Sequence, residues 1–310
     1  MALTSVSTLS GELIAYLEKR FLARSRNAIV FGEGAQKNAI PANTGNTIKF
    51  NRYAPLTSAS TALTEGGGTT YQSNPASVQP SPAQVSATIA QYGNVIALSD
   101  LLFVTSIDRE AKEKTDLMAQ NMAETLDNLI RDELYSGGTV QYANAKTALT
   151  AVASADVLTA TEVRKVRRSL RKNNAMPYDD GFYLAKIGPD TSYDIMNDSV
   201  WVNAHTYKDG DNLYKGEVGK LFTFRFIEAT ANQKTESSTV TVFSNFFHGQ
   251  QAFGTIDLDG MPNGLIVKQG GDQDTSNPLS LFITIGWKAA FAVKTLNANW
   301  VYNVKTAASA

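Results

Sequence analysis

The chain has 310 residues, no cysteine, 18% charged residues and a formal net charge of −1 at pH 7. This length allows about two or three domains. The lack of cysteine excludes disulfide bonds, thiol nucleophiles and thiolate metal ligands. The near-zero net charge means that the chain as a whole has no long-range attraction to nucleic acid or to an anionic membrane.

The apolar segments of the sequence are short. None approaches the roughly 20 residues that span a bilayer, and Glu12 and Glu18 interrupt the N-terminal apolar residues, which is unlike a signal peptide. We therefore expect a protein that is made and kept inside a cell, without membrane contact. The scarcity of charge suits a surface covered by copies of the same chain, although an ordinary soluble protein would also explain it.

Residues 10–24 have the pattern of a short amphipathic helix, with Ser10 as its expected N-cap. Four apolar side chains form one face of this helix: Leu13, Ile14, Leu17 and Phe21. The residues that follow, 31–46, are rich in Gly, Asn and Pro and cannot form a core of their own. We predict that residues 1–45 form an N-terminal arm whose apolar face packs against something else.

Residues 47–53 alternate apolar and polar side chains, which predicts a strand, and residues 84–100 predict its return strand. Gly93 is expected to shift the phase of the return strand, as a bulge would. About thirty residues lie between the two strands, and a connection of that length is uncommon within a compact domain. We therefore expect a long two-stranded projection with a flexible tip over residues 46–98.

The longest predicted helix covers residues 107–135, which contain no Pro or Gly and are rich in strong helix formers. Its apolar residues follow a three-and-four spacing that forms one stripe: Ala111, Leu117, Met118, Met122, Leu126, Leu129, Ile130 and Leu134. Thr105 and Ser106 are expected to cap its start, and Gly137 and Gly138 to end it with a left-handed residue. A helix of roughly 40 Å with one apolar stripe cannot be central to a compact core. We predict that it lies across one face of a sheet, as a spine.

The second half of the chain alternates helix and strand patterns. Thr159 and Glu162 have the spacing of a capping box, Pro189 is placed to begin a further helix, and residues 215–230 read as a glycine-punctuated turn and a strand. The apolar strands of residues 279–306 need a partner surface, which the stripe of the spine helix would supply. The predicted fold class is α+β, with a second α+β domain inserted into a discontinuous first domain.

Several stretches, in this order, resemble the major capsid proteins of tailed bacteriophages, which have the Hong Kong ninety-seven coat-protein fold. They look most like a podovirus-type capsid family. The stretches that carry the resemblance are VFGEGAQKNAIPANTGNTIKFNRYAPL, ATIAQYGNVIALSD, TLDNLIRDEL, GEVGKLFTFRFIEAT, FFHGQQAFGTIDLDG and GWKAAFAVKTLNANWVYNVKT. Together they extend over nearly the whole chain. None of them is a catalytic motif, so the resemblance rests on their order.

The resemblance implies a four-part organisation: an N-arm at 1–45, an extended loop at 46–98, a peripheral domain at 99–153 and 274–305, and an axial domain at 154–273. It implies a non-enzymatic subunit without cofactor that assembles as hexamers and pentamers into an icosahedral shell around double-stranded DNA. Assembly would take place in the host cytoplasm and the product would be the virion capsid. Expected partners are other copies of the chain, a portal protein, a decoration protein and a scaffolding protein. The scaffold is expected to be separate because arm residues begin almost at Met1.

The resemblance also implies where neighbouring subunits touch. Contacts are expected from the arm residues named above and from the extended loop, whose strand-forming flanks suit pairing with another chain. The loop residues are Ile48, Phe50, Arg52, Tyr71, Val85 and Ile89. Some relatives join their subunits by an isopeptide bond between a loop Lys and an Asn. Residues 51–110 contain no Lys, so we expect cohesion here to be non-covalent.

Few residues suggest chemistry. His205 and His248 are the only two histidines, and neither has a partner at ligand spacing, so structural roles explain them better than a metal site or a general base. The glycines at 66–68 lack the Lys-Ser/Thr that follows a phosphate-binding loop. Four aspartates near predicted turns do not fit the spacing of a calcium loop: Asp209, Asp211, Asp257 and Asp259.

The helix that follows Thr159 is strongly basic. If its outer face looked into a shell, it could neutralise packaged phosphates without reading sequence. The residues that would face DNA are Arg164, Lys165, Arg167, Arg168 and Arg171, and Lys172 extends the same cluster. A solvated helix face, or pairing with acidic groups of a neighbouring copy, would explain these charges equally simply.

Three functions therefore compete. A phage capsid protein explains the arm, the projecting loop and the lack of a catalytic motif. An encapsulin-type compartment has the same fold and would be distinguished by enzyme cargo inside it. An intracellular enzyme would need a convergent polar cluster, which the sequence does not offer. We favour the capsid protein.

Overall fold

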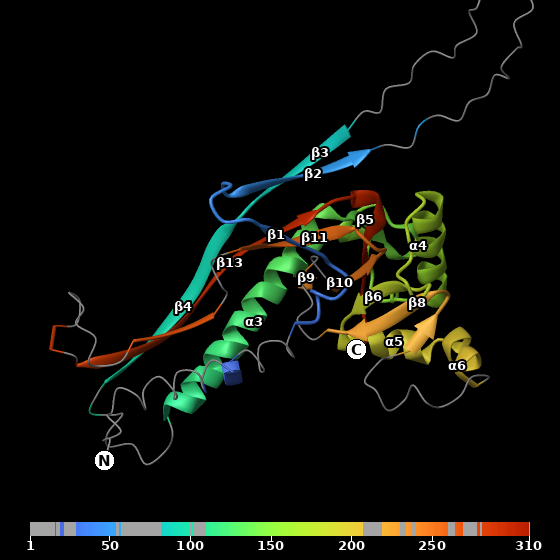
Figure 1. Cartoon of the computed structure of the whole chain (residues 1–310). Helices are drawn as coiled ribbons and strands as arrows, with labels where there is room; N and C mark the ends of the chain where they lie inside the picture. Colours follow the sequence, from blue (N-terminus) through green and yellow to red (C-terminus); the bar gives the residue numbers. More distant parts are fainter. Residues whose placement is uncertain are drawn as a thin grey trace, which may run out of the picture.

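The computed structural model describes most of the chain. The described residues are 16, 19–21, 29–53, 56, 82–99, 101, 110–206, 219–229, 234–236, 240–259, 264–268, 278–279 and 281–309. Two sheets and a long helix make up this structure, and a two-stranded hairpin extends away from it (Figure 1). No helix in the described part of the chain is long and apolar enough to cross a membrane.

The spine helix is α3 (Glu110–Gly137), 28 residues long. Its apolar stripe is buried against the first sheet, as predicted, in a cluster that includes Met118, Met122, Leu126, Ile130 and Leu134. Leu117 is an exception: it is 55% exposed, so its place in the stripe was wrong. The expected caps at 105 and 106, and the first residues of the predicted helix, lie outside the described residues.

Helix α3 ends at Gly137, where the sequence predicts it, but not for the predicted reason. Neither Gly137 nor Gly138 is among the glycines with positive φ, so no left-handed glycine ends the helix here. A Cβ on Gly137 would collide with Thr295, and one on Gly138 would lie 2.9 Å from the carbonyl oxygen of Leu134. The two glycines are therefore needed for close packing against the first sheet and the preceding turn.

The first sheet is built around β13 (Phe282–Thr295), which pairs antiparallel with three strands. These are β4 (Ala90–Ser99), β11 (Phe253–Leu258) and β12 (Gly264–Lys268). β1 (Gln36–Ile40) adds to β11 in parallel. Alternate residues of β13, among them Ile285, Trp287, Ala289 and Phe291, face α3 and bury its stripe. The expected packing of the C-terminal strands on the spine helix is confirmed.

The predicted bulge at Gly93 is wrong. β4 and β13 pair without interruption, and Gly93 lies directly opposite Lys288. A Cβ at this position would lie 2.6 Å from the carbonyl oxygen of Trp287, so the glycine allows a close approach of two backbones. The return strand is broken instead at Ile89, between β3 (Pro82–Thr88) and β4.

The hairpin consists of β2 (Thr47–Tyr53) and β3, which pair antiparallel with Phe50 opposite Val85. It forms a two-stranded sheet of its own and projects from the body (Figure 1). β4 belongs to the first sheet, so the structure divides the expected loop 46–98 between a projecting hairpin and a strand of the body.

The second sheet has the strand order β5-β14-β10-β6-β8-β7, with β9 beside β10. Its strands are β5 (Thr139–Tyr142), β14 (Val301–Thr306), β10 (Thr241–His248), β6 (Tyr183–Ile187), β8 (Phe224–Glu228), β7 (Gly219–Leu221) and β9 (Lys234–Glu236). Its helices are α4 (Ala160–Lys172), α5 (Pro189–Asn197) and α6 (Ser199–Thr206), and its short 3₁₀ turns are η1 (Ala143–Ala145), η2 (Leu149–Ala151) and η4 (Ala298–Trp300). A buried cluster joins α4 to this sheet through Val163, Val166, Leu170, Phe224 and Phe247.

Sheet membership does not follow the domain boundaries expected at 154 and 273. β11 and β12 lie within the expected axial segment but belong to the first sheet. β5 and β14 lie within the expected peripheral segments but belong to the second. The chain therefore passes between the two sheets more often than a single insertion requires.

The start of α4 is capped differently from the prediction. Thr159 is the N-cap residue, but its side chain makes no capping hydrogen bond. The first-turn amide of Ala160 donates to Asp198 at 3.0 Å instead. Glu162 is occupied elsewhere, because it accepts hydrogen bonds from the amide of Asn144 and from Lys165. The capping box is thus replaced by a cap from a distant residue.

Candidate functional site

The hairpin residues expected to contact neighbours lie mainly at its base. Ile48, Phe50 and Ile89 pack on a small buried cluster of the chain's own body that contains Ile40 and Ile256. Val85 is half-buried and Arg52 is exposed, while Tyr71 lies outside the described residues. The apolar base therefore anchors the hairpin to its own subunit. Any contact of the hairpin with a neighbouring subunit is therefore expected from the edges of its strands or from its tip.

The described part of the arm is attached to the spine helix. Phe21 is fully buried in the cluster beneath α3, so this arm side chain packs on its own chain. The guanidinium of Arg20 donates two hydrogen bonds of 2.6 Å to the carboxylate of Asp116 on α3. Such a bidentate pair fixes the direction of the arm. The other three predicted arm residues, Leu13, Ile14 and Leu17, lie outside the described residues.

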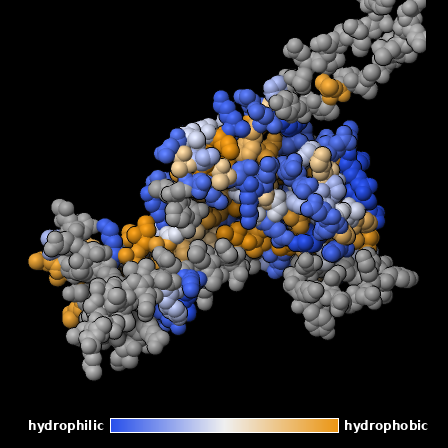
Figure 2. All heavy atoms as spheres, viewed as in Figure 1, coloured by the Kyte–Doolittle hydropathy of each residue, from blue (hydrophilic) through white to orange (hydrophobic). Residues whose placement is uncertain are grey.

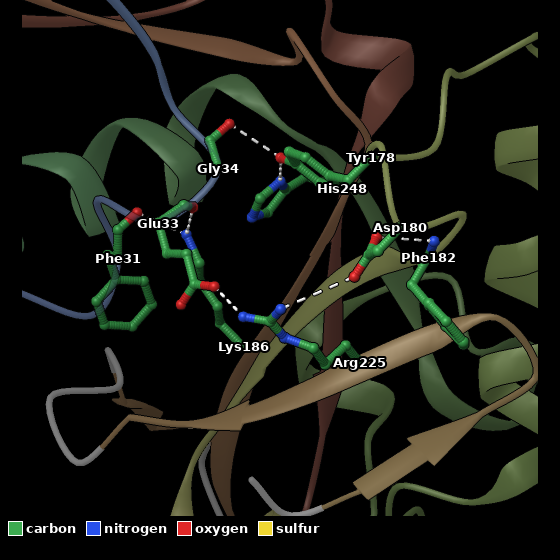
Figure 3. Close-up of polar contacts among 9 residues, drawn as sticks. All are labelled: Phe31, Glu33, Gly34, Tyr178, Asp180, Phe182, Lys186, Arg225 and His248. Carbon is green, nitrogen blue, oxygen red and sulfur yellow. Dashed lines mark hydrogen bonds and ion pairs between the residues drawn. The ribbon is translucent and has the colours of Figure 1, made fainter.

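Residues 30–34, within the arm segment 1–45, pack against the body, and we call the contacts that hold them the arm clamp. Lys186 on β6 is fully buried, and its ammonium donates to the carbonyl oxygens of Phe31 at 2.6 Å and Glu33 at 2.7 Å (Figure 3). From the opposite direction, Asp127 on α3 accepts a 2.6 Å hydrogen bond from the amide of Phe31. The clamp therefore joins the spine helix to the second sheet through the arm segment.

Two further contacts complete the arm clamp. The hydroxyl of Tyr178 donates to the carbonyl oxygen of Gly34 at 2.9 Å, and lies 2.9 Å from Nδ1 of the buried His248. Arg225 forms an ion pair with Glu33 and lies 3.8 Å from Asp180 (Figure 3). We assign the proton of His248 to Nδ1, because Nε2 is buried without a partner and a bare acceptor is less costly there than a bare donor.

Burial governs the ionisation of the clamp. It raises the pKa of the Asp127 carboxyl, although the Phe31 amide opposes the shift. It lowers the pKa of Lys186 to about 7, despite the attraction of Asp127 and Glu33. Burial also lowers the pKa of His248 well below its usual value, and the charge of Lys186 acts in the same direction. The main cation of the clamp therefore loses its proton close to neutral pH.

Sequence reasoning did not find the arm clamp. Two signals were present: a lysine inside the otherwise apolar strand YLAKI, and Asp127 directly after a buried residue of the spine stripe. A buried charge needs partners, so both residues were candidates for a polar network. Their partners, however, are backbone groups of residues 30–34, which sequence cannot identify.

The basic helix is α4. Arg164, Arg168 and Arg171 are exposed, and the Arg164 guanidinium lies over the ring of Phe222 at 4.5 Å. Lys165 pairs with Glu162 at 2.7 Å, so this cation is partly neutralised within the chain. Arg167 is half-buried, with an unpartnered Nε. The surface over α4, at the right of Figure 2, is mainly hydrophilic. The predicted DNA-facing residues thus divide between paired, packed and free side chains.

The remaining candidates for chemistry do not converge. Asp257 and Asp259 are exposed, on and just after β11. Asp209, Asp211 and the glycines at 66–68 lie outside the described residues, as does the side chain of His205. Among the residues that the structure describes, no group of three or more His, Cys, Asp or Glu is placed to hold a metal ion.

A further surface lies where β4 ends and β13 begins. Leu101, Leu279 and Leu281 are 70%, 76% and 57% exposed, and the pairing of Ser99 with Phe282 brings Leu101 and Leu281 to the same end of the sheet. Hydrophobic atoms are visible at that end, at the left of Figure 2. Exposed apolar residues that gather in one place are typical of interaction sites. We call these three leucines the distal patch.

The projecting hairpin and the exposed distal patch are typical of a protein that associates with other chains. The model of a phage capsid protein family (Phage_capsid_4) matches residues 82–305. The chain therefore belongs to this family of phage capsid proteins. No sequence among curated proteins matches it.

Solved capsid structures have the same fold. The capsid of Ralstonia phage GP4 superposes with a TM-score of 0.68 at 11% identity, covering 91% of this chain and 92% of that one. The capsid asymmetric unit of cyanophage Pam1 gives 0.66 at 16% identity, covering 92% of both chains. The capsid of cyanophage P-SCSP1u gives 0.64 at 16% identity, covering 91% and 89%.

Family and fold together make this chain a major capsid protein of a tailed phage, with the α+β fold of Hong Kong ninety-seven-like coat proteins. It is a structural component of the virion shell. The match to a phage family favours this function over a cargo compartment of the encapsulin type.

Proposed function

We propose that copies of this chain are held in the shell by non-covalent contacts made by the hairpin, the arm and the distal patch. The observation that carries the proposal is the hairpin itself. Its base is buried in its own subunit, whereas β2 and β3 form a separate two-stranded sheet that extends from the body. A projecting pair of strands gains stability by pairing with another chain.

The chemistry of the chain supports non-covalent cohesion. Residues 51–110 contain no lysine and the chain contains no cysteine, so the tip of the extended loop supplies neither the amine of an isopeptide bond nor a disulfide. Burial of the distal patch and pairing of the hairpin edges would provide the cohesion instead. In this assignment the arm is residues 1–45, the extended loop 46–98, the peripheral domain 99–153 and 274–305, and the axial domain 154–273.

The remaining partners follow from the proposed role in a DNA-filled shell. We assign a separate scaffolding protein and a portal protein to assembly in the host cytoplasm, and a decoration protein to the outer surface. Packaged double-stranded DNA would be contacted without sequence preference, through the exposed cations of α4. The role is structural and not catalytic.

Deleting the hairpin tip tests the proposal. Residues 64–80 are replaced by a short Gly-Ser linker, which leaves β2 and β3 intact. We expect a folded subunit with an unchanged unfolding temperature that fails to form stable shells when expressed with its scaffolding protein. Stable shells of normal yield, seen by electron microscopy, would contradict the proposed role of the hairpin.

A further inference from the structure

A hollow of about 540 Å³ lies between α4 and the turn that follows β5. Cations reach it from two walls: Lys165 and Arg168 from α4, and Lys146 from the turn. Ser169 and Thr147 add a hydroxyl on each side. The hollow therefore has cationic hydrogen-bond donors on two elements, while Val140, Tyr142 and Tyr302 contribute apolar surface to its lining.

The charges around the hollow do not cancel. Lys165 pairs with Glu162 at 2.7 Å, and Lys146 lies 3.9 Å from Asp156. Arg168 is exposed and has no charged or hydrogen-bonding partner in the part of the chain that the structure describes. Two carboxylates thus face three cations, which leaves one positive charge at the mouth of the hollow.

The two carboxylates, Glu162 and Asp156, also accept hydrogen bonds from groups other than the lysines. Glu162 also accepts from the amide of Asn144 at 3.1 Å and from Gln141 at 3.2 Å. Asp156 accepts from the side chain of Asn144 at 2.5 Å and from the amide of Ala153 at 2.8 Å. An ammonium group has three N–H donors. Lys146 and Lys165 therefore keep donors that are free to bind a group in the hollow.

The wall that carries Lys146 is strained. Asn144 and Ala145 have φ of 50° and 55°, a conformation that alanine rarely adopts. Such strain persists only where the surroundings impose it, and here the bonds of Asn144 to Glu162 and Asp156 do so. The strained turn carries Lys146 into the lining of the hollow, to which Arg168 also belongs.

We propose that this hollow binds a phosphate group of the double-stranded DNA backbone. The inference rests on the proposed contact between the shell and its packaged DNA, and it names the residues of α4 that make that contact. Donors that converge from two walls suit the oxygens of a tetrahedral phosphate better than those of a planar carboxylate. A phosphodiester carries one negative charge, which matches the unpaired Arg168. Nothing in the hollow reads a base, so binding would be independent of sequence.

The test measures binding of a short, mixed-sequence double-stranded DNA to the full-length unassembled chain, by fluorescence anisotropy at several salt concentrations. Arg168→Gln and Lys146→Gln remove one cation from each wall. Each is expected to weaken binding about tenfold and to lower the slope of log affinity against log salt by roughly 0.9. Lys37→Gln is the control, because this exposed lysine on β1 belongs to the other sheet, is not among the cations of α4 and does not line the hollow. Its effect should stay within about twofold, since exposed charges are screened by salt.

Three outcomes would overturn the proposal. Equal losses in Arg168→Gln and Lys37→Gln would mean that only the total charge of the chain matters. Unchanged DNA affinity in Lys146→Gln would show that the turn after β5 does not contribute to phosphate binding. Unchanged DNA affinity in Arg168→Gln, with loss of shell assembly, would assign the hollow to a carboxylate of a neighbouring subunit. Shell assembly by the wild-type chain is scored separately, so a failure of the hollow leaves the proposed function untouched. Unfolding temperatures confirm that each variant is folded.

Discussion

The burial of Lys186 shifts its pKa enough to make the stability of the folded chain depend on pH. Its pKa is about 7 in the folded chain and near 10.5 in the unfolded chain. Between about pH 7 and pH 9.5 the unfolded state therefore binds a proton that the folded state has released, and stability rises with pH. We expect the free energy of unfolding to increase in this window by up to about 1.4 kcal/mol per pH unit. Urea unfolding at a series of pH values measures it.

The control for this prediction removes another lysine. Lys186→Met should reduce the rise, whereas Lys37→Met, at an exposed position on β1, should retain it in full. Part of the rise should remain in Lys186→Met, because burial also lowers the pKa of Lys305. Two other side chains of the arm clamp with shifted pKa values do not raise the free energy of unfolding in this window. Burial lowers the pKa of His248 and raises that of Tyr178, so His248 acts below the window and Tyr178 above it. An undiminished rise in Lys186→Met would show that the arm clamp is not its source.

At the scale of the element, the spine helix offers a matched pair of leucines. Leu126 is buried against the first sheet, and Leu117, on the same helix, is 55% exposed. Leu126→Asp buries a charge without a partner and is expected to cost several kcal/mol, a large part of the stability of a domain. Leu117→Asp should cost within about 0.5 kcal/mol. Thermal unfolding distinguishes them, and equal stabilities would contradict the packing of α3 on β13.

The spine helix was predictable because its evidence is local. A stripe of apolar residues with a three-and-four spacing indicates both the helix and the face that it buries. The C-terminal strands were identified as its partner because they needed an apolar surface and the stripe was unmatched. Leu117 was misplaced because one residue at the margin of a stripe can point to either side. Gly93 was misread because a glycine in a strand can mark either a bulge or a close approach of backbones.

Other elements depend on partners that are distant in sequence. The turn between β7 and β8 has positive φ at Phe222 and Thr223, residues that do not signal such a turn. The cap of α4 comes from Asp198, and the arm clamp from backbone groups of residues 30–34. The placement of β11 and β12 in the first sheet depends on long-range pairing with β13. None of these contacts leaves a pattern in the residues that make it.

For the whole molecule, the absence of suitable amines and thiols leads to a prediction about assembled particles. Mature shells boiled in denaturing detergent should release a single band near 33.5 kDa, because no covalent bond joins the subunits. The chain has no cysteine, and its lysines lie outside residues 51–110. Denaturing gel electrophoresis of purified particles is the measurement. A ladder of covalent oligomers would contradict it.

The most direct test of the central claim is a cryo-electron microscopy reconstruction of the particle that forms when the chain is expressed with its scaffolding protein. We predict a closed icosahedral shell of hexamers and pentamers. In that shell, the hairpin of each subunit lies on a neighbour, and no density links their side chains covalently. Discrete monomers or small oligomers, or shells in which each hairpin folds back on its own subunit, would contradict it.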